Sequence, residues 1–261
     1  MSLVRNKYEL MNEIGKGKFG VVYKAIDIQC KKEVAVKFDG SKVGLLRNEA
    51  TILNYLTSNK CGNIPLIHWY GLYGNDCIPC IVIPFYEYSL SQYILLKNPL
   101  TSQLNILFSR MLKILESIHN LYVIHRDIKP DNFMFNKYGE LTLIDFGISS
   151  FCHPNIEDKK PSQFTGNLIY ASPSVHNLNI CKAIDDIISL SYVYLFMCCD
   201  GKLHWTNLNE TTTVCNSKIE KILTEKKIEN IELHISLNDN IDKKISSFLR
   251  KLYNGVVCYE F

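Results

Sequence analysis

The sequence predicts an α+β protein in which a small β-rich lobe comes first and a larger, mainly helical lobe follows. The first ~85 residues are mostly short β-branched and aromatic runs of the kind that forms strands. After about Tyr86, apolar residues recur instead at helical spacing. The chain has 261 residues, 47% hydrophobic and 21% charged, which supply enough core for two such lobes. We place the first lobe at residues 1–86 and the second at 87–261, with the boundary within Pro84–Ser91.

The expected elements follow from periodicity. Strands are expected over Tyr8–Ile14, Val21–Asp27, Glu33–Phe38, Ile64–Tyr73 and Ile78–Phe85. Leucines and alanine at helical spacing predict one helix over 45–56 in the first lobe. In the second lobe, an apolar stripe from Leu104 to Ile118 predicts a helix, with Pro99, Thr101 and Ser102 as its start signals. The apolar run Ile187–Cys199 is too short to span a bilayer and predicts a helix buried on all sides.

Net charge and cysteine spacing bear on the partners and the location of the protein. Twenty-nine Lys and Arg against 26 Asp and Glu leave a net charge of only +3, and the basic residues are scattered, so nucleic acid is not an expected partner. No apolar stretch follows the start, and the ten cysteines are irregularly spaced. We therefore expect reduced thiols in an intracellular protein, cytoplasmic or nuclear, that is not attached to a membrane. Cys77 and Cys80 have no second Cys/His pair at zinc spacing, so we expect structural thiols, with Pro79 in a hairpin turn.

A glycine-rich stretch lies between the first two expected strands. In Gly15-Lys16-Gly17-Lys18-Phe19-Gly20-Val21, glycine permits unusual backbone angles and lets main-chain N–H groups approach phosphates. A tight glycine hairpin would have the same sequence, so both readings stand. The stretch leads into a strand and does not end in Gly-Lys-Ser/Thr, which argues against a Rossmann fingerprint and a Walker A loop.

One lysine interrupts the next apolar strand. Lys37 ends Val34-Ala35-Val36-Lys37, and a lysine in a half-buried strand needs a counter-charge to offset desolvation. Glu49, on the expected helix, is a candidate partner. The alternative is an edge-strand lysine in water.

The strongest chemical signal is the run from Val123 to Phe133, followed by Leu143-Ile144-Asp145-Phe146-Gly147. Asp127, Asn132 and Asp145 provide a proton acceptor and two hard oxygen ligands, which suit a substrate hydroxyl and Mg²⁺. Lys129 adds positive charge where a transferred phosphoryl group gathers negative charge. The spacing of all four residues, downstream of the glycine loop and Lys37, indicates phosphoryl transfer.

These motifs resemble the protein kinases, and within them the casein kinase 1 family, from about Tyr8 to the C-terminus. The likeness to that family rests on four stretches: Asn63–Gly71, His125–Phe133, Thr165–Ser172 and Asp185–Leu190. The resemblance implies a bilobal protein kinase fold that uses ATP and Mg²⁺. Because the chain stops near Tyr259, earlier than that family's catalytic domain, we expect shortened or missing last helices.

The resemblance also implies residue roles. A loop would cover the nucleotide, formed by Ile14, Gly15, Lys16, Gly17, Lys18, Phe19, Gly20, Val21 and Val22. Lys37, paired with Glu49, would hold the α- and β-phosphates, and Asp127 would accept the substrate proton. Lys129 would touch the γ-phosphate, and Asn132 and Asp145 would hold Mg²⁺. Ala35, Ile83, Pro84 and Tyr86 would line the adenine site, with Ile83 at its back and Pro84 in the hinge.

Other residues in the resembling stretches bear on specificity. Lys129 is typical of a Ser/Thr kinase, and Asp186 would tie down the His125–Asp127 loop, although an ordinary helix N-cap would look the same. Asn167 replaces a usual threonine, and its amide is expected to hydrogen-bond the catalytic loop. Ile169 replaces an arginine of a substrate anion site, of which Lys218 keeps the other half. Preference for acidic or phosphorylated substrates is therefore expected to be weak.

Two functional hypotheses follow. The first is an active, monomeric Ser/Thr kinase that acts on protein substrates, favoured by retention of the full set of motif residues. The second is a pseudokinase that binds nucleotide or partners without transfer, favoured by Asn167 and the early end of the chain. The segment Ile148–Asn167 has 20 residues and no phosphosite beside an arginine cluster, so activity without its phosphorylation is expected.

Overall fold

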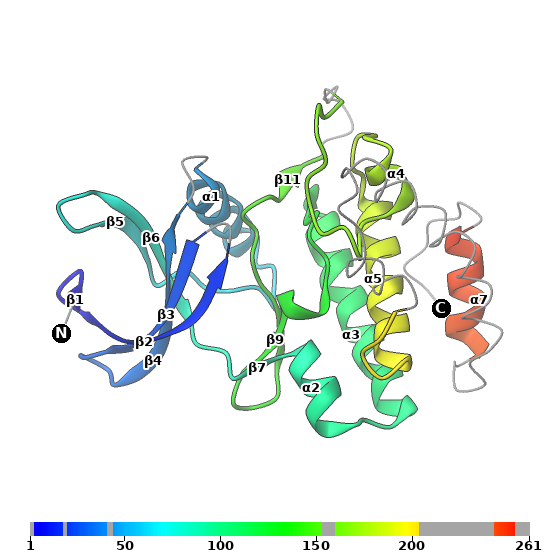
Figure 1. The fold of residues 1–261 in the computed structure, drawn as a ribbon, viewed down its shortest axis with the longest axis horizontal. Coiled ribbons are helices and arrows are strands. Elements are labelled where there is room, and N and C mark those ends of the chain that lie inside the picture. The colour runs from blue at the N-terminus through cyan, green and yellow to red at the C-terminus, as the bar shows by residue number, and fades with distance from the viewer. Residues whose placement is uncertain (1–2, 18–19, 41–43, 153–159, 204–242, 254–261) are drawn as a thin grey trace, which may run out of the picture. The chain divides into compact units, whose positions relative to one another are not determined.

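The computed structural model describes residues 3–17, 20–40, 44–152, 160–203 and 243–253. The chain forms two compact units. The first comprises the residues up to Tyr88 together with Phe133–Ser149, and the second comprises Ser89–Asn132 and the chain from Ser150. Strands are the main elements of the first unit and helices those of the second (Figure 1). The predicted α+β class is confirmed.

An antiparallel six-stranded sheet is the frame of the first unit. Its strands, in spatial order, are β1 (Leu3–Val4), β2 (Tyr8–Gly17), β3 (Gly20–Asp27), β4 (Lys32–Asp39), β6 (Ile78–Pro84) and β5 (Trp69–Tyr73). Successive side chains of a strand point to opposite faces. One face carries a buried apolar cluster that includes Tyr8, Ala25, Val36 and Val82. The alternating apolar residues therefore form strands because one face of the sheet can be buried.

The expected strand over Ile64–Tyr73 is shorter in the structure, where it begins only at Trp69. His68 N–H still donates to Val82 O of β6 at 2.8 Å, but Asn63, just before the expected strand, bonds elsewhere. The Asn63 side-chain amide donates to Leu141 O at 2.9 Å, and Leu143 N–H donates to Asn63 O at 3.0 Å. Pro65 has no N–H to offer a neighbouring strand. The bonds of Asn63 and the missing N–H of Pro65 thus interrupt pairing before His68, in spite of the strand propensity of Ile64 and Ile67.

Helix α1 (Leu45–Ser58) confirms the helix predicted in the first lobe. Its apolar stripe is buried, with Leu46, Leu53 and Leu56 at most 1% exposed. The helix packs against β4 and β6 of the same unit. Glu49 is on this buried side and is itself only 1% exposed, so the stripe carries a carboxylate into the interior.

Several very short strands were not expected from the sequence. β10 (Leu141–Leu143), β9 (Phe133–Phe135) and β7 (Tyr88–Ser89) form a small sheet, and β8 (Val123–Ile124) pairs with β11 (Ser150–Phe151). Strands of two or three residues are too short to show a period of two. They depend on their partners, as the 2.8 Å bond from Glu87 N–H to Phe135 O illustrates.

Helices account for most of the described second unit. They are α2 (Leu90–Lys97), α3 (Thr101–His119), the 3₁₀ turn η1 (Pro130–Asn132), α4 (Pro173–His176), α5 (Ala183–Cys198) and α7 (Lys243–Tyr253). α3 and α5, both predicted, pack side by side (Figure 1). The rings of Phe108 and Tyr194 lie 4.8 Å apart between them, and the Tyr194 hydroxyl donates to Asn105 Oδ1. Burial of α5 on all sides is confirmed.

Helix α2 was not predicted from the sequence, although Ser89 and Gln92 form a recognisable signal for its start. Ser89 Oγ accepts from Gln92 N–H, and Gln92 Oε1 accepts from Ser89 N–H. This reciprocal capping box needs Ser and Gln three residues apart, which the sequence has.

The Cys77–Cys80 region differs from the expected turn. The hairpin turn runs over 74–77, closed by a bond from Cys77 N–H to Gly74 O, whereas Pro79 lies in β6 opposite Leu72. Burial raises the pKa of the Cys80 thiol to about 11, and Cys77 is exposed. Within the described ranges, no helix combines the length and apolar character needed to cross a membrane.

Candidate active site

Lys37 joins two carboxylates in the first unit. Its Nζ lies 2.8 Å from Glu49 Oε2 and 2.7 Å from Asp145 Oδ1. Burial by itself would lower the pKa of Lys37, but the two carboxylates outweigh burial and raise it above its ordinary value. The lysine is therefore a fixed positive charge. The alternative of an edge-strand lysine in water is wrong, because this side chain is only 17% exposed and doubly paired.

Strand register places other expected nucleotide-binding residues on the same sheet face as Lys37. Val22 lies opposite Lys37 across β3 and β4, and Ala35 lies opposite Ile83 across β4 and β6. Residues two apart on a strand share a face. Val22, Ala35, Lys37 and Ile83 therefore share the face that lies away from the apolar cluster. Ile83 is 8% exposed, which suits the closed end of a binding surface.

Two expected loop residues have side chains on the other face. Lys16 lies opposite Val21, and Val21 lies opposite Phe38, which packs on the apolar cluster. Val21 also lines an apolar hollow with Phe38 and Tyr73. A nucleotide on the Lys37 face would therefore meet the main chain of Val21 and not its side chain.

The glycines of the loop are placed by β2 and β3. Gly17 pairs with Gly20 at the end of the hairpin, while Lys18 and Phe19 lie outside the described residues. Gly20 has a φ of +144°, and a Cβ there would lie 1.9 Å from Phe38 O, so only glycine fits. Gly15 lies opposite Val22, whereas Ile14 is 44% exposed.

The two remaining adenine-site residues follow Ile83. Pro84 ends β6 opposite Val34, so its missing N–H costs no bond at the strand's end. Tyr86 is partly buried, and burial raises the pKa of its hydroxyl to about 12 in spite of a hydrogen bond with Thr142. The Tyr86 hydroxyl is therefore neutral and held against β10.

Asp145 has an unusual backbone conformation. Its φ is +66°, a left-handed value that non-glycine residues adopt rarely and aspartate more readily than most. Directly after it, Phe146 is fully buried, and Ser149 N–H donates to Phe146 O to close a turn. Such strained residues concentrate at functional sites. The carboxylate of Asp145 is thereby directed at Lys37 by a backbone that local propensity does not favour.

In the second unit, Asp127, Lys129 and Asn132 form one hydrogen-bonded network. Asp127 Oδ2 accepts from Lys129 Nζ at 2.6 Å and from Asn132 Nδ2 at 3.1 Å. Asn132 Nδ2 also donates to the Asp127 main-chain oxygen at 2.8 Å. The amide nitrogen is thus committed to Asp127, which leaves the amide oxygen of Asn132 as an acceptor for a cation. Asp127 is 7% exposed, so its carboxylate is largely shielded from solvent.

Asp186 holds the loop that carries Asp127. From the first turn of α5, its carboxylate accepts from His125 N–H at 2.7 Å, from Arg126 N–H at 2.9 Å and from His119 Nε2 at 3.0 Å. Burial alone would raise the pKa of Asp186, but these bonds hold it below its ordinary value. Asp186 therefore ties down the His125–Asp127 loop and is not the helix N-cap. His119, which sequence reasoning missed, had no local signal.

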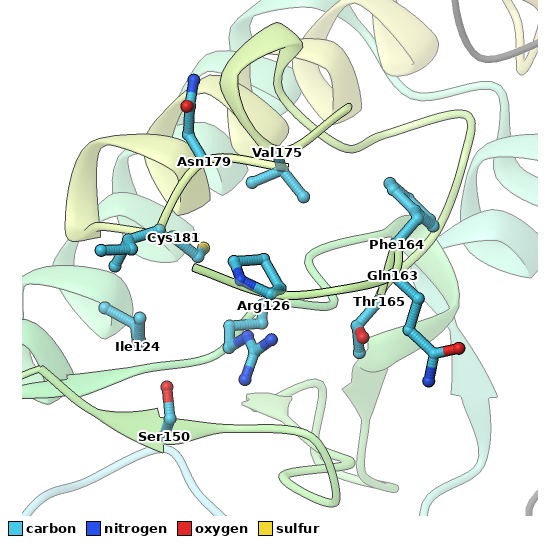
Figure 2. Close-up of a pocket in the computed structure, with 11 residues that line it drawn as sticks. Ile124, Arg126, Ser150, Gln163, Phe164, Thr165, Val175, Asn179 and Cys181 are labelled. Carbon is cyan, nitrogen blue, oxygen red and sulfur yellow. The ribbon is translucent and has the colours of Figure 1, made fainter. Parts of the chain in front are cut away.

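Arg126 lies in a cavity of about 160 Å³ within the second unit. Figure 2 shows its side chain among Ile124, Ser150 and Thr165. Its φ is +71°, and among the residues that the structure describes no carboxylate pairs with it. A Cβ on Gly166 would lie 2.9 Å from Arg126 O, so glycine permits a close approach of these two segments.

Asn167 does not make the expected bond to the catalytic loop. Its Oδ1 accepts from Ile169 N–H at 2.9 Å and Tyr170 N–H at 3.3 Å, so the side chain caps its own turn. The short span to these two N–H groups outcompetes the more distant loop. Ile169 is half-buried, and Lys218 lies outside the described residues.

Two residue groups are thus assembled, one in each unit. The first unit brings together Lys37, Glu49 and Asp145, and the second brings together Asp127, Lys129 and Asn132. The carboxylate of Asp145 and the amide oxygen of Asn132 are hard oxygen donors of the kind that Mg²⁺ prefers. The residues present therefore fit a magnesium-dependent phosphoryl transfer.

Comparison with family models agrees with this chemistry. The model of the protein kinase domain matches residues 8–257, which is nearly the whole chain.

Proposed function

Because this chain belongs to the protein kinase family, we propose that it transfers the γ-phosphoryl group of Mg-ATP to serine and threonine hydroxyls of protein substrates, in the manner of the casein kinase 1 family. The observation that carries the proposal is the doubly paired Lys37, 2.8 Å from Glu49 and 2.7 Å from Asp145. A lysine held in this state is the phosphate-binding charge of a competent kinase.

Asp127 is the residue that acts on the substrate hydroxyl. Its carboxylate orients the hydroxyl and accepts its proton as the oxygen–phosphorus bond forms. Lys129, 2.6 Å from the same carboxylate, supplies positive charge to the transferred group. The bond from Asn132 Nδ2 fixes the orientation of the Asp127 carboxylate.

The nucleotide is held by charge and by oxygen donors. Lys37 binds the α- and β-phosphates, and the sheet face with Val22, Ala35 and Ile83 receives the adenine. Asn132 and Asp145 are the protein ligands for Mg²⁺, which when bound neutralises charge on the phosphates. Glu49, at 1% exposure, keeps Lys37 in place when the nucleotide leaves.

Serine/threonine specificity rests on Lys129, which stands two residues after Asp127 where tyrosine kinases usually carry a different loop sequence. The casein kinase 1 likeness rests on stretches such as Asn63–Gly71 and Asp185–Leu190. Asp186, with its bonds to the His125 and Arg126 main chain, gives the last of these stretches a physical role.

The test is a γ-phosphoryl transfer assay with the purified full chain, Mg-ATP and casein, followed by phosphoamino-acid analysis. We expect phosphoserine and phosphothreonine, abolished by Lys37→Met. A matched control is Lys60→Met, the same change at an exposed site after α1. If nucleotide raises the melting temperature of the protein but no transfer occurs, the chain is a pseudokinase and the proposal is wrong. Phosphotyrosine as the main product would overturn the specificity.

A further inference from the structure

Asn48, the residue before Glu49 on α1, contacts three main-chain oxygens of the segment after Asp145. Its Nδ2 lies 2.8 Å from Ser149 O, 3.0 Å from Gly147 O and 3.5 Å from Phe146 O. All four residues belong to the first unit. Because three carbonyl oxygens surround this atom, it is the NH₂ end of the amide that points to them.

Asn48 lies next to Glu49 on α1, so one helix contacts the Asp145 segment through two adjacent side chains. Glu49 acts through Lys37 on the Asp145 carboxylate and also accepts a main-chain hydrogen bond from Phe146. Asn48 donates to the main-chain oxygens from Phe146 to Ser149, and it alone of the two reaches Gly147 and Ser149 in the described structure. The helix therefore holds both the side chain of Asp145 and the turn that follows it.

The segment needs such a restraint. Asp145 has a φ of +66°, which its local sequence does not favour. The turn after it is closed by a main-chain bond from Ser149 N–H to Phe146 O at 3.1 Å. A donor that bridges Gly147 O and Ser149 O closes the same turn from outside. Leu45 of α1 also lies beside Gly147, since a Cβ there would be 3.7 Å from the Leu45 Cβ.

We propose that Asn48 is a positioning residue that holds the Phe146–Ser149 turn and thereby keeps the Asp145 carboxylate in its metal-binding orientation. The proposal rests on the proposed function, because it assigns Asp145 its role toward Mg²⁺. Asn48 touches no reacting atom. It couples helix α1 to the metal ligand through hydrogen bonds to the main chain. A substitution of Asn48 should therefore raise the Mg²⁺ concentration needed for activity.

The experiment compares four variants of the full chain. Asn48→Asp is isosteric but replaces the donor with an oxygen that the three carbonyls repel, and Asn48→Ala removes the contact. Asn48→Gln keeps the amide on a longer stem as the rescue. Asn54→Asp makes the same chemical change at an exposed site of the same helix and is the matched control.

Five quantities are measured: kcat, the KM for peptide, the Mg²⁺ concentration at half activation, the melting temperature, and hydrogen exchange at the Ser149 amide. In Asn48→Asp we expect kcat to fall roughly 10-fold and the half-activating Mg²⁺ to rise several-fold, with the KM for peptide within about twofold. Ser149 exchange should quicken in Asn48→Asp and Asn48→Ala. Asn48→Gln should lie nearer the unaltered protein, and Asn54→Asp should match it.

Three outcomes would contradict either this proposal or the proposed function. Equal Mg²⁺ dependence and equal Ser149 exchange in Asn48→Asp and Asn54→Asp would overturn the proposal. A drop in melting temperature with unchanged Mg²⁺ dependence of the folded protein would also overturn it, since that is a merely structural role. If the unaltered protein transfers no phosphoryl group, the proposed function fails. The Ser149 exchange then decides by itself whether Asn48 holds the turn.

Discussion

At the scale of single residues, two non-glycine positions in the chemical motifs break local backbone rules. Arg126 and Asp145 have φ values of +71° and +66°. Both are held by contacts from elsewhere in their own unit: Asp186 accepts from Arg126 N–H, and Lys37 binds the Asp145 carboxylate. Strained backbone persists where surrounding contacts over-determine it, and it is commonest at functional sites.

The first residue-scale prediction concerns Asp127→Asn. The amide cannot accept the substrate proton, and it loses the charge that pairs with Lys129 at 2.6 Å. Turnover should fall by about 10²-fold or more, while the nucleotide-induced rise in melting temperature stays unchanged. The control is Asp76→Asn, the same change in an exposed hairpin turn. A variant with near-normal kcat, free of contaminating kinase, would remove Asp127 from its role.

The second residue-scale prediction concerns Ile169. The uncharged Ile169 side chain binds no anion, which leaves Lys218 as the only charge of the site expected from the sequence. One ion pair at a protein surface is worth about 1 kcal/mol or less. The protein should therefore prefer an upstream phosphoserine several-fold at most. Ile169→Arg supplies a guanidinium that binds phosphate in a bidentate manner and should increase that preference. The measurement is kcat/KM for matched peptides with phosphoserine or alanine upstream, at fixed salt.

Ile169→Gln is the uncharged control for this comparison. A large phosphoserine preference in the unaltered protein would show that residues other than Ile169 form the anion site.

At the scale of elements, single buried side chains join helices to functional segments. Asp186 of α5 binds two N–H groups of the catalytic loop and His119 at the end of α3. Glu49 and Asn48 do the same for α1 and the Asp145 segment. An unpaired buried polar group is costly, so such a side chain specifies one arrangement of the elements it joins.

The element-scale prediction concerns Asp186→Asn and pH. Removing this buried charge leaves an N–H group of the loop unsatisfied and should lower the free energy of unfolding by about 2–4 kcal/mol at pH 7. The folded-state pKa of Asp186 lies below its ordinary value of 3.8. Near these pKa values the folded protein therefore binds fewer protons than the unfolded chain. The stabilisation by the Asp186 charge is complete above about pH 4–5.

The stability difference between the unaltered protein and Asp186→Asn should accordingly shrink as pH falls through the folded-state pKa. Urea unfolding at several pH values measures it, with Asp200→Asn, an exposed carboxylate just after α5, as the control. A difference that stays constant from pH 7 to pH 3 would show that the Asp186 charge does not stabilise the fold.

At the scale of the whole molecule, each of the two units is built from two separate stretches of the chain. Phe133–Ser149 belongs to the first unit although it follows the catalytic loop in sequence. The bonds between Asn63 and the β10 residues Leu141 and Leu143 contribute to this assignment. The Asp145 segment is therefore supported by Lys37 of β4 and Asn48 of α1, both in the first unit.

The molecule-scale prediction follows from that support. Lys37 and Asn48 hold the Asp145 segment through unmodified side chains, so phosphatase-treated protein should keep its specific activity. Mass spectrometry verifies removal of phosphate, and mock treatment with inactivated phosphatase is the control. Loss of activity on dephosphorylation, restored by an upstream kinase, would refute this expectation.

The sequence by itself determined the elements with strong periodicity and the compact chemical motif. β4, α1, α3 and α5 follow from alternation or helical stripes longer than about one turn. The Asp127–Asn132 network was also predictable in outline, because five residues separate its ends and a tight turn brings them together. Local patterns carry this information because their energies depend on near neighbours along the chain.

Only the tertiary structure decided which distant residues meet. Lys37 and Asp145 are 108 positions apart, and Asn48 bonds to Ser149 across a similar span. The short strands β7 to β11 likewise depend on partners that no local window contains. The physical reason is that burial and hydrogen-bond completion are satisfied by the whole fold, which overrides local propensity wherever the two disagree.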